Sequence, residues 1–168
     1  MSDGEVRERG SRMRWEDGTV YGLILAGIYF LVGVLFFYGG KEKIFDGIGA
    51  PPGIEKQFAG TFLDTIPGID AAWTILGILE LAIFVLLIVS LVTLEFMPNR
   101  RKPFLLSGLA LSIFTFAILA IGQNVTGEHE GVQGLFLYAG ATGVLAFLVL
   151  QMPPYKPGNW ISGRGGPS

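Results

Sequence analysis

Hydrophobic residues along this chain fall into four long runs, and the segments between them carry almost all of the charge. The runs cover residues 19–39, 71–96, 104–122 and 135–152. About 20 consecutive apolar residues suffice for a helix to cross the hydrocarbon core of a bilayer. No run alternates apolar and polar residues with a period of two, as the strands of a membrane barrel do. The pattern therefore predicts an all-α integral membrane protein, a bundle of four transmembrane helices.

The distribution of Lys and Arg indicates which way this bundle faces. Nine lie in the N-terminal tail (1–18), in the connection between the second and third runs, and in the C-terminal tail (153–168), against three in the other connections. Cytoplasmic connections carry the excess of these residues, so both tails are predicted to be cytoplasmic. The first run has no evident cleavage site after it and is interpreted as a retained helix. We expect an irregular C-terminal tail and a mobile N-terminal tail.

The amino-acid composition limits which cofactors, metals and partners the chain can bind. Of 168 residues, 51% are hydrophobic and 15% are charged, and the mean hydropathy is +0.54. Cysteine is absent, which excludes disulfides, iron–sulfur clusters and thiolate metal sites. A single histidine, His129, excludes a centre with several His ligands. The net charge of −2 gives no reason to expect a nucleic-acid partner. The sequence thus predicts no metal site and identifies no catalytic residue.

Glu80 is a charged residue deep inside the second run. A carboxylate at that depth costs about 2.5–3.5 kcal/mol unless it is neutral, paired or facing water. The nearest cations are Lys41 and Lys43 at the end of the first run, and Lys43 is preferred if that helix continues past Gly40. Two interpretations stay open, a buried pair that fixes packing and a proton relay or ligand anchor. Glu95, at the far end of the same run, is expected to be solvated.

The connection over residues 41–70 is long for a compact bundle, and such connections often carry structure or function. Apolar residues recur every four positions within residues 53–65, which predicts one short amphipathic helix in the outer interface or between the spans. This helix is interpreted either as a lid that only covers the bundle or as a lid over a ligand pocket. In the second interpretation Phe45, Phe58 and Phe62 face the ligand.

The connection over residues 123–134 is polar and is expected to be a surface loop on the same side. Gln123, Asn124 and His129 are its candidate polar contacts. In the fourth run, Gly140 and Gly143 belong to a narrow face of small residues, which lets membrane helices approach closely.

Two short motifs give the chain a family resemblance. Residues Gly40 to Phe45 read Gly-x-x-Lys-x-Phe at the end of the first run, and Gly77 to Leu81 read Gly-x-x-Glu-Leu in the second. With the long connection between them, this arrangement resembles the DoxX-like family of small four-span membrane proteins over residues 21–151. That family includes DoxD, a subunit of a thiosulfate:quinone oxidoreductase. The resemblance implies that Lys43 and Glu80 occupy the family's Lys and Glu positions. It also implies a quinone-linked or redox-accessory role in a bacterial cytoplasmic membrane.

Three functions compete. The first is a non-catalytic accessory or anchoring subunit of a respiratory or redox membrane complex, with the bilayer and other membrane subunits as partners. The second is a subunit that itself binds a quinone, or a lipid, between the lid and the bundle. The third is a small-solute transporter that uses Glu80. The absence of cofactor ligands favours the first, and a stand-alone enzyme is the less expected outcome.

Overall fold

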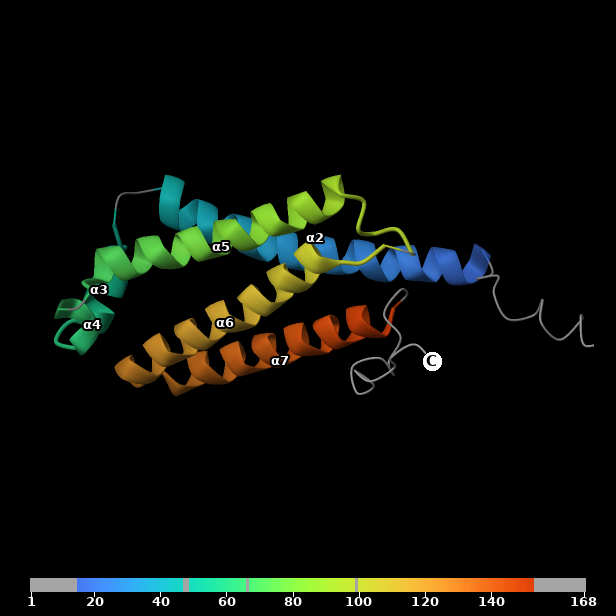
Figure 1. The fold of residues 1–168 in the computed structure, drawn as a ribbon. Coiled ribbons are helices and arrows are strands. Elements are labelled where there is room, and N and C mark those ends of the chain that lie inside the picture. Colours follow the sequence, from blue (N-terminus) through green and yellow to red (C-terminus); the bar gives the residue numbers. More distant parts are fainter. Residues whose placement is uncertain (1–14, 47–48, 66, 99, 153–168) are drawn as a thin grey trace, which may run out of the picture.

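The computed structural model describes residues 15–152 except 47–48, 66 and 99, so the two predicted tails lie almost wholly outside the described residues (Figure 1). Six helices occur in this part of the chain: α2 (Trp15–Phe45), α3 (Pro52–Phe58), α4 (Phe62–Thr65), α5 (Ile69–Val92), α6 (Pro103–Thr126) and α7 (His129–Gln151). The predicted all-α architecture is confirmed. Four of the helices, α2, α5, α6 and α7, are long and apolar enough to cross a membrane. The chain is therefore a multi-pass helical membrane protein.

The four long helices pack in chain order. Helix α2 packs on α5, α5 on α6, and α6 on α7, while the short helices α3 and α4 lie at one end of the bundle (Figure 1). Apolar side chains from all four long helices form one core, which includes Leu25, Ile83, Leu109 and Val149. Many large apolar side chains outside this core are exposed, as expected for a surface that faces lipid. Helix α7 packs mainly on α6 and lies at the edge.

Two helix ends differ from the predicted runs. Helix α2 continues to Phe45, beyond the predicted end at residue 39, so Lys43 lies in its last turn. Helix α5 ends at Val92, whereas the predicted run extends to residue 96. The backbone NH groups of Leu94 and Glu95 bond back to the carbonyls of Leu91 and Ser90, which ends the helix in a Schellman arrangement. Leu94 has the φ of 59° that this arrangement requires. Glycine usually holds that position, so the sequence carries no evident stop signal there.

The two connections at the end of the bundle near α3 and α4, 41–70 and 123–134, also differ from prediction. The single helix predicted over residues 53–65 is two helices, because the chain turns at Gly60, whose φ of 77° is left-handed. Phe58 and Phe62 therefore lie on different helices. The predicted loop over residues 123–134 is largely helical, since α6 extends to Thr126 and α7 begins at His129. Gly127, with a φ of 79°, ends α6 and permits this tight turn.

Candidate functional site

The end of α2 brings Lys43 against Glu80 in the middle of α5. The Lys43 Nζ lies 2.9 Å from Oε2 of Glu80 and donates a hydrogen bond of 3.2 Å to its Oε1. It also donates to the carbonyl of Gly39 at 3.2 Å and lies 4.8 Å from the centroid of the Trp73 ring. The two side chains are only 10% and 7% exposed. The cation is thus held by a carboxylate, a carbonyl and an aromatic face, away from solvent.

Three glycines allow α2 and α5 to meet closely around this pair. A Cβ added at Gly39 would lie 2.9 Å from Oε2 of Glu80. A Cβ at Gly40 would lie 2.8 Å from the Leu81 side chain, and one at Gly77 would lie 2.7 Å from the Cβ of Lys43. Real Cβ atoms do not tolerate such distances, so a larger residue at Gly40 or Gly77 would push the helices apart, and one at Gly39 would displace the Glu80 carboxylate. Small residues let membrane helices approach in this way.

Lys41 and Phe45 do not join the Lys43–Glu80 pair. The Nζ of Lys41 pairs with Asp46 at 2.8 Å, and both side chains are more than 40% exposed. Phe45 is 71% exposed. These two predicted site residues lie at the end of α2, on the outside of the bundle.

Helices α3 and α4 cover an apolar pocket of about 210 Å³ above α5 and α6. Phe58, Trp73 and Gln123 are among the residues that line it. The amide of Gln57 donates to Oε1 of Gln123 at 3.4 Å and to Thr126 at 3.2 Å, which fastens α3 to the end of α6. The structure therefore brings two of the residues predicted on this side into one pocket.

The other residues predicted on this side do not line the pocket. Phe62 is 62% exposed, and Asn124 and His129 are exposed as well. Among the residues that the structure describes, no three His, Cys, Asp or Glu side chains lie close enough to hold a metal ion.

A polar network that the sequence analysis missed lies at the opposite end of the bundle. Glu95 is only 3% exposed, so the expectation that it is solvated is wrong. Its Oε1 accepts the NH of Phe104 at 3.1 Å, and its Oε2 accepts the NH of Leu105 at 3.0 Å. Because the chain reverses at Leu94, the carboxylate lies at the N-terminus of α6, where it satisfies free NH groups and meets the positive end of the helix dipole.

Two hydroxyl groups extend this network to α2. Ser90 Oγ donates to Oε2 of Glu95 at 2.6 Å, and the phenol oxygen of Tyr29 lies 2.6 Å from Ser90 Oγ. Because Ser90 gives its one hydroxyl proton to Glu95, the Tyr29 phenol donates to Ser90. A chain of hydrogen bonds thus runs from α2 through α5 to the start of α6. The only signal in the sequence was the presence of a Tyr and a Ser inside apolar runs.

Lys102 completes this end of the bundle just before α6. It is fully buried and donates to the carbonyls of Arg100 at 3.0 Å and Met97 at 3.4 Å. Its Nζ lies 5.5 Å from the centroid of the Tyr21 ring. Burial lowers the pKa of Lys102 from its ordinary value of 10.5, and the charge of Glu95 acts in the opposite direction.

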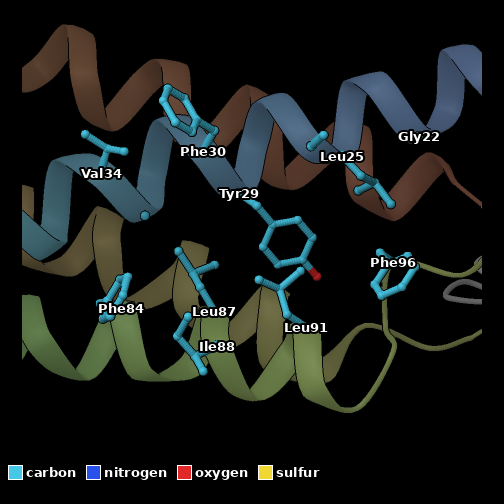
Figure 2. Close-up of a pocket in the computed structure, with 12 residues that line it drawn as sticks. Gly22, Leu25, Tyr29, Phe30, Val34, Phe84, Leu87, Ile88, Leu91 and Phe96 are labelled. Carbon is cyan, nitrogen blue, oxygen red and sulfur yellow. The ribbon is translucent and has the colours of Figure 1, made fainter.

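A groove of about 540 Å³ lies between α2 and α5 next to this network (Figure 2). Its lining consists of Gly22, Leu25, Ala26, Tyr29, Phe30, Gly33, Val34, Phe84, Leu87, Ile88, Leu91 and Phe96. Figure 2 shows the ring of Tyr29 lying between the two helices, close to Leu87 and Leu91. Tyr29 carries the single polar side-chain atom among these lining residues.

These features define a helical membrane protein with a buried ion pair between α2 and α5 and a polar network where α5 meets α6. No family model, no curated protein and no solved structure matches the chain.

Proposed function

We propose that this chain is a non-catalytic accessory or anchoring subunit that assembles with another membrane protein. The complex is a quinone-linked redox complex of a bacterial cytoplasmic membrane, and the chain lies in it with both termini cytoplasmic. The excess of Lys and Arg near the termini supports that orientation. The resemblance to the DoxX-like family supports the redox role. The assembly itself is supported by one observation, the outward face of α7.

This face of α7 carries a notch made of two glycines between two aromatic side chains. Phe136, Gly140, Gly143 and Phe147 recur at intervals of three and four, so they share a side of the helix. The two Phe side chains are 69% and 59% exposed, and a Cβ added at either glycine would have none of the described residues within 4 Å.

The same chain uses small residues differently elsewhere. Where α2 meets α5, Gly39, Gly40 and Gly77 are each in close contact with the facing helix. In lipid, apolar surface alone gives helices little reason to associate, and small residues mark the places where they pack. Glycines also weaken a helix relative to alanine. A glycine pair on α7 with no neighbour in the described part of its own chain therefore fits a helix supplied by another subunit.

Native mass spectrometry of the tagged protein, gently extracted from its own membranes, tests this proposal. We expect co-purifying subunits in a fixed ratio. Gly143→Leu should lower that ratio, because the new side chain fills the notch. Gly134→Leu is the matched control, since Gly134 lies on nearly the opposite side of α7 and, among the described residues, also has no neighbour within 4 Å. A protein that runs alone or as a homo-oligomer, or equal losses in the two variants, would refute assembly through this face.

The second candidate function is binding of a quinone within the membrane. It is supported by two apolar hollows of about 210 and 540 Å³, the smaller beneath α3 and α4 and the larger between α2 and α5. The transport hypothesis gains no comparable support. The hydroxyl groups of Ser112, Thr115 and Thr142 donate to carbonyls of their own helices, which is how such residues usually satisfy themselves inside a helix.

A further inference from the structure

The groove between α2 and α5 is lined by apolar residues and by Tyr29, which is 9% exposed and carries the one hydroxyl group among the lining side chains. Besides Tyr29, its walls include the aromatic rings of Phe30, Phe84 and Phe96. Behind the wall, Ser90 and Glu95 are 0% and 3% exposed and hold the Tyr29 phenol in place. The groove therefore contains a fixed polar group whose direction is set by the network behind it.

We propose that this groove is a binding site for a membrane-soluble hydroquinone, with the phenol oxygen of Tyr29 accepting a hydrogen bond from the hydroquinone hydroxyl. The inference rests on the second candidate function and assigns it a place. It differs from the place that the sequence predicted, between the loop helices and the bundle.

The direction of the hydrogen bond between Tyr29 and Ser90 determines which kind of ligand the phenol oxygen can bind. Because Tyr29 donates its proton to Ser90, its oxygen keeps a lone pair that can accept a hydrogen bond from a ligand. A lipid acyl chain can fill an apolar groove but has no donor to offer. A hydroquinone carries an O–H group on a flat ring, and its apolar tail keeps it in the bilayer. Aromatic walls favour such a ring over an acyl chain, since ring pairs interact beyond simple burial.

The groove between α2 and α5 and the pocket beneath α3 and α4 differ in volume. Sites for small molecules and cofactors usually measure about 300–1,000 Å³. The groove, at about 540 Å³, falls in this range, whereas the pocket beneath α3 and α4, at about 210 Å³, falls below it. In the smaller pocket, the Gln123 amide oxygen already accepts a hydrogen bond from Gln57. The groove therefore offers the room that the smaller pocket lacks.

The test is a titration of the purified full-length protein, counting bound ligand by native mass spectrometry. The two probes are a decyl-substituted benzohydroquinone and its di-O-methyl ether, which keeps the ring and tail but has no O–H donor. We expect Tyr29→Phe to weaken binding of the hydroquinone about 2- to 10-fold, the size of one net hydrogen bond, and to leave binding of the ether unchanged. Tyr38→Phe is the matched control, because Tyr38 lies on the same helix and is 63% exposed.

A second pair of variants locates the site independently of the phenol. Gly33 lines the groove and Gly122 lines the smaller pocket. A Cβ at either position meets its nearest neighbour at an ordinary distance, 3.9 and 3.5 Å, so both backbones accept a side chain. We expect Gly33→Leu to abolish hydroquinone binding and Gly122→Leu to leave it intact.

Each contrary result would overturn a different part of the proposal. Loss of binding in Gly122→Leu with retention in Gly33→Leu would overturn the assignment to the groove but keep quinone binding as a function. Equal effects of Tyr29→Phe on the two probes would overturn the hydrogen bond, and with it the proposed recognition. A wild-type protein that retains only phospholipid and no hydroquinone would overturn both the site and the second candidate function. The assembly of the chain through α7 is tested separately.

Discussion

Removing Lys43 should destabilise the bundle far more than removing an exposed lysine. Lys43→Met leaves the carboxylate of Glu80, 7% exposed, without its cation. Two unit charges 2.9 Å apart attract by about 6 kcal/mol at an effective dielectric constant of about 20. Desolvation of both groups offsets much of that gain, yet breaking such a buried pair from one side costs about 3–5 kcal/mol. We expect a loss of that size in the free energy of unfolding.

The double variant Lys43→Met/Glu80→Leu should recover most of this loss, because no charge then remains in the interior. Unfolding in mixed micelles with increasing SDS, followed by tryptophan fluorescence, measures all variants, and Trp73 lies beside Nζ of Lys43. Lys41→Met is the control and should cost about 0–1 kcal/mol, since its pair with Asp46 is exposed. A cost below about 1 kcal/mol for Lys43→Met, or a double variant whose cost equals the sum of its parts, would refute the coupling of these charges.

Two further predictions concern close packing and pH. Gly77→Ala should destabilise the protein by about 1–3 kcal/mol in the same unfolding assay, because the new Cβ would lie 2.7 Å from that of Lys43, whereas Gly134→Ala should be neutral or slightly stabilising. Equal effects would show that the crossing of α2 and α5 is loose. Because burial lowers the pKa of Lys102, the folded protein loses that proton before the unfolded chain does. Stability should therefore rise with pH between the lowered pKa and about 10.5, and Lys102→Met should remove this rise. A stability profile that is the same in the variant and the wild type would contradict this.

Much of the fold was accessible from the sequence because hydropathy alone determines where helices cross a bilayer. The pairing of Lys43 with Glu80 was a candidate for the same reason, since an intramembrane carboxylate requires a partner and few cations are in reach. In the sequence, Gly40 and Gly77 are significant only as part of the motifs that carry the family resemblance. The structure adds a physical role, because Gly39, Gly40 and Gly77 let the two helices meet.

The polar network of Tyr29, Ser90 and Glu95 could not be predicted from the sequence, for two reasons. Glu95 follows a long apolar run and comes shortly before Arg100 and Arg101, a pattern typical of a solvated helix end. Its burial depends on the reversal at Leu94, where a leucine holds a conformation that usually indicates glycine. The contact between Tyr29 and Ser90 joins residues 61 positions apart and requires the relative rotation of α2 and α5, which hydropathy does not determine.

The uneven distribution of polar links has a consequence for how the protein is assembled during synthesis. Helices α2, α5 and α6 are joined by the Lys43–Glu80 pair and by the hydrogen bonds of Ser90 and Glu95. In the part of the chain that the structure describes, α7 forms no side-chain hydrogen bond to another long helix and is held by packing against α6. It is also the last of these four helices along the chain, so it leaves the ribosome after the other three. Helices α2, α5 and α6 can therefore pack together before α7 enters the bilayer, and α7 then packs against a partner, α6, that is already in place.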